Sequence, residues 1–159
     1  MFETIVWASD GSAHSNLCLP YVRDLGERYA SSMIIVHVIE ELAVGALRGP
    51  EVHAYEDRTV AKLKAQTLAL RRRGIPASLH VIRGATGHCA RHVADVADSI
   101  DADLMICGSR GRAPASGALL GSFSLRLLAA SPCPVLVVVD GSSPRPRVGE
   151  PVTGSATPA

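Results

Sequence analysis

The chain has 159 residues, 47% of them hydrophobic and 19% charged, with a formal net charge of +1, and this length fits one domain with a buried core. Its 16 basic residues nearly cancel its 15 acidic ones, which argues against a nucleic acid or an anionic membrane as a partner. Because it has no apolar stretch near the roughly 20 residues of a membrane span, no signal peptide and no closely spaced cysteines, we expect a cytoplasmic protein.

Short apolar runs alternate with segments of helical period along the chain. The predicted elements, in order, are a strand at residues 4–9, a helix at about 15–29, a strand at 33–39, a helix at 55–73, a strand at 78–82, a helix at about 89–100, a strand at 104–108, a helix from Gly121 to before Pro132, and a strand at 135–139. The second, fourth and fifth strands do not alternate apolar with polar residues, as is typical of parallel strands covered on both faces. Each strand is followed by a helix long enough to cross over, so we predict a single α/β domain with a doubly wound sheet.

Local signals suggest where these helices begin and end. Pro20 falls in the opening turns of the first helix, while Thr86 is a plausible N-cap for the third. The second helix should stop at Arg71–Arg73, because the positive charges favour its C-terminal end, Gly74 can adopt a left-handed cap and Pro76 forbids continuation. We expect these arginines to be a solvated helix end.

Two segments stand outside the pattern. Residues 41–54 contain two glycines and Pro50 and predict a loop near a binding site. Residues 141–159 are rich in proline, glycine and serine without apolar period, so we predict a disordered C-terminal tail after a domain at residues 1–140.

Open parallel sheets bind ligands beyond the carboxyl ends of their strands, and two loops leave those ends here. The loop after the fourth strand contains Gly108, Gly111 and Gly121, which let backbone N–H groups approach a bulky ligand, and it leads into the N-terminus of a helix. Hydroxyls of Ser122 and Ser124 and the guanidinium groups of Arg110 and Arg112 could add donors, which suggests a polyphosphate. A flexible surface loop is the alternative that composition alone leaves open.

Asp10 follows the first strand and has two interpretations. Its carboxylate could accept hydrogen bonds from ribose hydroxyls or help to hold Mg²⁺, or it could cap the first helix. The sequence has no Walker A motif, since GKS and GKT are absent, and the first strand is followed by SDGS in place of GxGxxG.

Several spaced motifs, taken together, resemble the universal stress protein family across residues 1–140. Gly108-x-x-Gly111, then nine residues, then Gly121-Ser122 is similar to its ATP-binding motif. Ser9-Asp10-Gly11-Ser12 resembles its D-G-S opening and His37-Val38 its LHV segment, while residues 131–138 (SPCPVLVV) resemble its closing S-x-x-P-V-L-V-V.

The resemblance implies a Rossmann-like three-layer α/β/α sandwich with a five-stranded parallel sheet of order 3-2-1-4-5. It also implies ATP, with Mg²⁺ at Asp10 as a further option, and a homodimer formed through the last strand. The nucleotide-binding residues it implies are Ala8, Ser9, Asp10, Val38, Gly108, Arg110, Gly111, Gly121, Ser122, Phe123 and Ser124. The dimer residues it implies are Val135, Leu136, Val137, Val138 and Val139, an apolar edge strand that invites pairing on physical grounds as well.

Other chemistry is weaker. Hydrolysis of ATP needs a positioned base, and we assign no catalytic residue. We therefore favour an ATP-binding stress or regulatory module. The alternatives are a slow nucleotide hydrolase or nucleotidyl-transfer enzyme on the same fold, or a dimerisation module without nucleotide. His88 and His92 have a metal-compatible spacing without a third ligand, so surface histidines are favoured. Cys107 is expected to be a small apolar residue of a buried strand; Cys133 is the most plausible reactive thiol, although an inert one is favoured.

Overall fold

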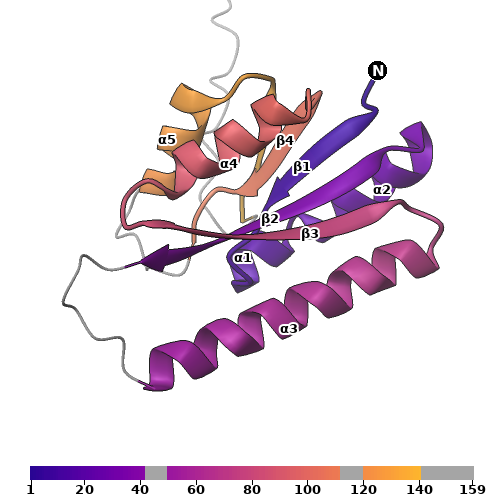
Figure 1. The fold of residues 1–159 in the computed structure, drawn as a ribbon. Helices are drawn as coiled ribbons and strands as arrows, with labels where there is room; N and C mark the ends of the chain where they lie inside the picture. The colour runs from indigo at the N-terminus through magenta and orange to yellow at the C-terminus, as the bar shows by residue number, and fades with distance from the viewer. Residues whose placement is uncertain (42–49, 112–119, 141–159) are drawn as a thin grey trace, which may run out of the picture.

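The computed structural model describes residues 1–41, 50–111 and 120–140, which form a five-stranded parallel sheet of order β3-β2-β1-β4-β5 (Figure 1). The elements are β1 (Thr4–Ala8), α1 (Ala13–Asn16), α2 (Leu19–Tyr29), β2 (Ser32–Glu41), α3 (Pro50–Arg72), β3 (Ala77–Ala85), α4 (Cys89–Ser99), β4 (Leu104–Gly108), α5 (Ser122–Ala130) and β5 (Val135–Val138). The predicted fold class, strand order and parallel pairing are confirmed. The predicted tail at residues 141–159 lies outside the described residues, as does Arg112.

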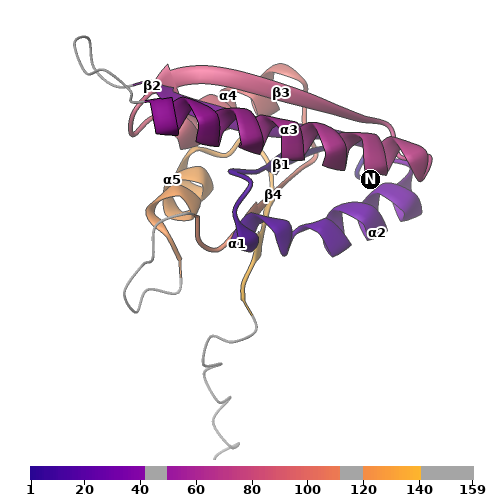
Figure 2. The same cartoon turned by 90° about the horizontal axis from the view of Figure 1, so that it is seen from below.

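The helices cover both faces of the sheet, with α1, α2 and α3 on one side and α4 and α5 on the other (Figures 1 and 2). Side chains of β1 alternate between the two sides, so that Ile5 and Trp7 join one apolar cluster while Val6 and Ala8 join the other. Both clusters are buried, which explains why the strand sequences show no polar face.

Three predictions about where helices begin are wrong, for local reasons. The helix predicted from about residue 15 is broken into α1 and α2. Pro20 lies in the first turn of α2, where the missing backbone N–H of proline removes no intrahelical hydrogen bond. Helix α3 begins at Pro50, inside the predicted loop, because proline suits the first position of a helix. Thr86 does not cap α4; its hydroxyl donates to the carbonyl of Glu41, and His88 occupies the N-cap position.

The end of α3 agrees with its sequence signals. Gly74 has φ +80°, the left-handed conformation that glycine adopts readily. The arginines do more than face solvent, because Arg71 donates from Nε to the carbonyl of Ala77 at 2.6 Å and Arg73 pairs with Glu27 at 2.6 Å. These contacts fasten the end of α3 to β3 and α2.

A carboxylate at the start of β4 fixes the beginning of β1. Asp103 Oδ2 accepts hydrogen bonds from the backbone N–H groups of Thr4 (2.9 Å) and Glu3 (2.8 Å). These bonds, that of Thr4 above all, lower the pKa of the Asp103 carboxyl below its ordinary value. Because folding lowers this pKa, the carboxylate stabilises the fold above about pH 4, and the contribution is lost as the pH falls through the lowered folded value.

We therefore expect Asp103→Asn to lower the free energy of unfolding at pH 7, and the difference from the parent to shrink steadily between about pH 5 and pH 2. Urea unfolding followed by circular dichroism at several pH values measures this. Asp101→Asn is the matched control, because Asp101 is exposed and its positive φ (48°) suits asparagine. A difference at Asp103 that does not vary with pH would contradict the assignment.

Candidate functional site

Strands β1 and β4 lie side by side, with Ile5 opposite Leu104 and Trp7 opposite Ile106. From β1 the chain passes to β2 on one side of this pair, and from β4 it passes to β5 on the other side. At such a switch point the two outgoing turns diverge and leave a crevice beyond the strand ends, which is where ligands bind in open α/β sheets.

The turn after β1 is held closely by the sheet and by its own side chains. Ser9 is buried, and its N–H donates to the carbonyl of Val36 at 3.0 Å. Asp10 Oδ1 accepts from the N–H of Ser12 at 3.0 Å, and Gly11 has φ +73°. Any side chain at Gly11 would be strained and would also collide with the methyl group of Thr59 on α3.

Helix α1 is capped by Ser12, whose Oγ accepts from the N–H of Ser15 at 3.2 Å. The alternative in which Asp10 caps this helix is therefore wrong. Asp10 instead closes the tight turn before the cap with one of its carboxylate oxygens.

The second carboxylate oxygen of Asp10 lies against the loop that follows β4. A Cβ atom placed on Gly111 would come within 3.0 Å of Asp10 Oδ2. The two loops that the sequence assigned to one site thus meet at these two residues. The absence of a side chain at Gly111 is what leaves room between them.

The other two glycines of the motif have structural roles of their own. A Cβ on Gly108 would lie 2.9 Å from the carbonyl oxygen of His14, so the backbone of α1 already occupies that side of the residue. Gly121 donates its N–H to the carbonyl of Ser109 at 2.7 Å, which closes the loop at its base. Both were assigned to phosphate binding, and both also shape the loop.

Helix α5 begins close to the turn after β4, since a Cβ atom placed on its N-cap residue Gly121 would lie 3.6 Å from the Cα atom of Arg110. Gly121 is at its N-cap position and provides no side-chain hydrogen bond, so within the described residues the first turn of α5 has no side-chain cap. Ser124 was assigned as a donor to phosphate, but its buried hydroxyl donates to the carbonyls of Gly108 (2.9 Å) and Ser109 (3.1 Å). Its hydroxyl therefore ties α5 to the end of β4 and is already used as a donor within the described residues.

The remaining assigned residues differ in exposure. Ala8 is buried at the end of β1, whereas Ser122 is exposed at the start of α5. Arg110 and Val38 are half-buried, and Val38 lies in the part of β2 that extends past β1 and pairs with β3. Phe123 is half-buried and packs on the cluster beneath α4 and α5.

Three residues hold the turn after β1 and were not assigned to the site from the sequence, although His37 was noted as part of the LHV-like segment. His37 lies in β2 between the carbonyl of Ser9 and the carboxylate of Glu56, and Lys62 donates from Nζ to the carbonyl of Gly11 at 2.6 Å. A histidine in the apolar run MIIVHVI is a signal that could have identified His37. The two residues of α3 show no signal, because only the packing of α3 on the sheet brings them to this turn.

Among the described residues, the cysteines and the pair His88 and His92 do not form a metal site. Burial raises the pKa of the Cys18 thiol to about 12 and of the Cys107 thiol to about 11, and it also raises the pKa of Cys133, which was the most plausible reactive thiol.

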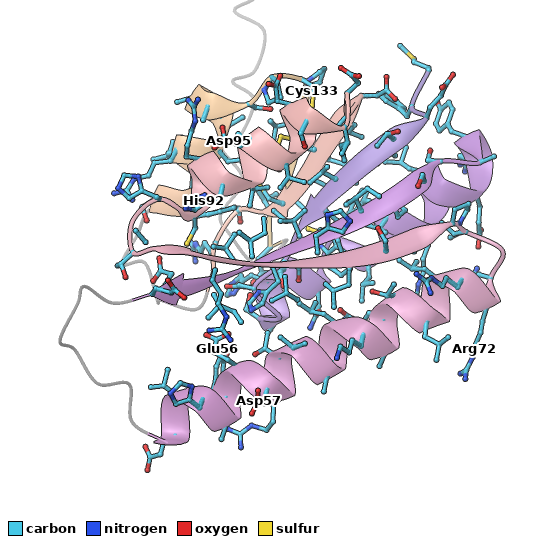
Figure 3. The ribbon with its side chains drawn as sticks, in the orientation of Figure 1. Glu56, Asp57, Arg72, His92, Asp95 and Cys133 are labelled. Carbon is cyan, nitrogen blue, oxygen red and sulfur yellow. The ribbon has the colours of Figure 1, made fainter. Side chains whose placement is uncertain are left out.

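His92, labelled on α4 in Figure 3, packs its imidazole on Gly84 of β3. Among the described residues, no group of three or more His, Cys, Asp or Glu side chains could hold a metal, and no helix is long and apolar enough to cross a membrane.

An open parallel sheet of order β3-β2-β1-β4-β5, with its switch point between β1 and β4, defines a Rossmann-like α/β protein. Residues 1–139 match the universal stress protein family, and the chain belongs to that family. A relative, the universal stress protein Sll1654 of Synechocystis, is 33% identical over 140 residues, which cover 87% of this chain and 86% of that protein.

Solved structures share the fold. The protein MJ0577 superposes with a TM-score of 0.70 at 24% identity, covering 90% of this chain and 99% of that one. A universal stress protein from Archaeoglobus fulgidus in complex with dAMP has a TM-score of 0.63 at 18% identity, over 87% of this chain and 98% of that one. A universal stress protein solved in complex with cAMP has a TM-score of 0.58 at 21% identity, and the match covers 87% of this chain and 97% of that one.

Proposed function

We propose that the protein binds an adenine nucleotide, and ATP in particular, in the crevice between the turn after β1 and the first turn of α5. The observation that carries this proposal is the meeting of Asp10 with Gly111 beside the N-terminus of α5. N–H groups at a helix N-terminus and glycine-lined loops favour phosphate, and a carboxylate favours ribose hydroxyls. The family members solved with cAMP and dAMP support an adenine nucleotide as the ligand class.

Each part of the nucleotide has a proposed partner. Asp10 would accept from the ribose, and the backbone of Val38 would contact the base. The phosphates would be held by Gly111, Arg110 and the backbone N–H groups of the first turn of α5. Ala8 and Ser9 would form the floor of the crevice, since both are buried at the end of β1. Mg²⁺ would arrive with the phosphates and take Asp10 as one ligand, as is usual for nucleotide-bound magnesium.

In this proposal the protein is a cytoplasmic, nucleotide-responsive stress or regulatory module with little or no catalysis. The chain's residues bind and orient the nucleotide, and binding stabilises the folded state by linkage. Bound nucleotide would also shift the populations of the loops around the crevice, which is how a partner could sense it.

We also propose that the protein forms a homodimer through β5. This strand lies at an edge of the sheet, with Val135, Leu136 and Val137 half-buried and Val139 48% exposed. An apolar edge strand pairs readily with a second copy of itself. Sedimentation velocity of the full chain measures the oligomeric state, and a monomer at all concentrations would contradict this part of the proposal.

The test of nucleotide binding is thermal unfolding with and without Mg-ATP. At a hundredfold excess over Kd, the nucleotide should add about 2.7 kcal/mol and raise the Tm by roughly 5–10 °C. Gly111→Val should weaken binding at least about tenfold, because its side chain fills the space beside Asp10. Gly74→Ala is the control: it strains a left-handed turn far from the crevice, so stability falls while affinity is kept.

Three results would contradict the proposal or narrow it. Parent protein that shows no shift with ATP, AMP or cAMP at millimolar concentration would contradict nucleotide binding. Equal affinity of Gly111→Val and the parent would mean that the crevice is wrongly located. Multiple-turnover release of phosphate would favour the hydrolase alternative over a binding module.

A further inference from the structure

His37 is a buried titratable side chain that the proposed nucleotide contacts do not use. Its side chain is 1% exposed and lies between β2 and α3. Nδ1 is 2.9 Å from the carbonyl oxygen of Ser9, and Nε2 is 3.1 Å from Glu56 Oε2. Figure 3 shows Glu56 on α3, on the side of the helix that faces the sheet.

The chemistry of the partners fixes the direction of these hydrogen bonds. A carbonyl oxygen only accepts, so His37 Nδ1 carries a proton and donates it to Ser9. On the other side of the ring, Nε2 lies 3.1 Å from Glu56 Oε2. A hydrogen bond between these two atoms needs one proton, which is carried either by the imidazole or by the carboxyl group. In both cases Glu56 holds the ring with its donating nitrogen aimed at Ser9.

Other residues of α3 support the same turn. The methyl group of Thr59 packs against Gly11, Lys62 Nζ bonds to the carbonyl of Gly11, and Gln66 Nε2 donates to Asn16 Oδ1 at 2.9 Å. These residues follow Glu56 at spacings of three or four, so they form one stripe along the helix. The whole segment from the end of β1 to the end of α1 rests on that stripe.

We propose that His37, held by Glu56, is a positioning residue for nucleotide binding. Ser9 precedes Asp10, so fixing the Ser9 carbonyl fixes the direction in which the Asp10 side chain leaves the strand. This inference rests on the proposed function, because Asp10 is taken as the ribose partner. In this proposal Nδ1 has a specific role as the hydrogen-bond donor to Ser9. An imidazole that only filled buried space would have no such role.

Two substitutions separate the two nitrogen atoms. His37→Asn keeps a donor near the position of Nδ1 and loses the contact with Glu56, while His37→Gln reaches the position of Nε2 and loses the bond to Ser9. We expect the glutamine variant to bind Mg-ATP about tenfold more weakly than the parent and the asparagine variant to stay within about threefold. Isothermal titration calorimetry measures affinity, and urea unfolding without nucleotide measures the stability of each variant.

A second readout needs no nucleotide. Hydrogen exchange of the full chain should be faster at the N–H groups of Gly11 and Ser12 in His37→Gln than in His37→Asn, because both bond within this turn. If the glutamine variant does not fold, His37→Leu, which also lacks a donor to the Ser9 carbonyl, should show the same faster exchange.

The outcomes are distinct for the two proposals. Equal exchange at the turn and equal affinities in the two His37 variants, or a loss of affinity that only follows stability, would overturn the role of His37. Parent protein that binds no adenine nucleotide would contradict the proposed function. In that case the exchange rates at Gly11 and Ser12 still decide whether His37 holds the turn.

Discussion

Replacing Trp7 with alanine is expected to lower the free energy of unfolding by about 3–5 kcal/mol. Trp7 is fully buried in β1 and belongs to the apolar cluster between the sheet and helices α2 and α3. Its removal leaves a cavity next to two neighbouring strands, in addition to the lost transfer free energy. Since domains of this size are stable by about 5–15 kcal/mol, the variant should be marginally folded.

The measurement is urea unfolding followed by far-ultraviolet circular dichroism, because Trp7 is the only tryptophan of the chain and its fluorescence is lost with it. Trp7→Phe is the matched control. It keeps a buried aromatic ring in the same cluster and removes the indole Nε1 group, so the loss should be clearly smaller. A cost of less than about 1.5 kcal/mol for alanine would mean that the indole does not pack as described.

The second large effect is expected at Gly108. Alanine there places a methyl group 2.9 Å from the carbonyl oxygen and 3.1 Å from the carbonyl carbon of His14, both of which belong to the backbone of α1. Backbone atoms can only move with the whole helix, so we expect a loss of about 1–3 kcal/mol in the free energy of unfolding. Helix α1 should also shift away from β4.

Gly111→Ala provides the contrast, because among the described residues its methyl group meets the Asp10 carboxylate at 3.0 Å and no backbone atom. Stability should change by no more than about 0.5 kcal/mol, while nucleotide affinity falls. For both glycine variants, chemical denaturation measures the free energy of unfolding and isothermal titration calorimetry measures the affinity for nucleotide. Similar losses of stability for both variants would contradict the distinct roles assigned to these glycines.

The sheet could be predicted from the sequence because its strands are covered on both faces. The strand at residues 104–108 was predicted residue for residue, since a short continuous apolar run is typical of a parallel strand covered on both faces. Strand β3 extends to Ala85, three residues beyond the prediction, because an edge strand tolerates Arg83 and Gly84. Pro50 was interpreted as a loop residue when it starts a helix, and proline is common in both settings.

The candidate site was only partly predictable. Motif spacing led to Asp10 and Gly111, and these residues do lie against each other. The same spacing could not show that the hydroxyl of Ser124 points back to the carbonyl of Gly108, because this depends on where α5 lies relative to the end of β4. Contacts that join different elements, such as Glu56 to His37, depend on helix placement and leave no local signature.

The pairing of β1 with both β2 and β4 has a consequence for the order in which the protein can form during translation. Ile5 pairs with Met33 and also with Leu104, so one side of the strand can find its neighbour early and the other must wait for most of the chain to leave the ribosome. Such sequence-distant pairing slows folding and prolongs the exposure of aggregation-prone surface. The nascent protein should therefore depend on chaperones until β4 has been synthesised.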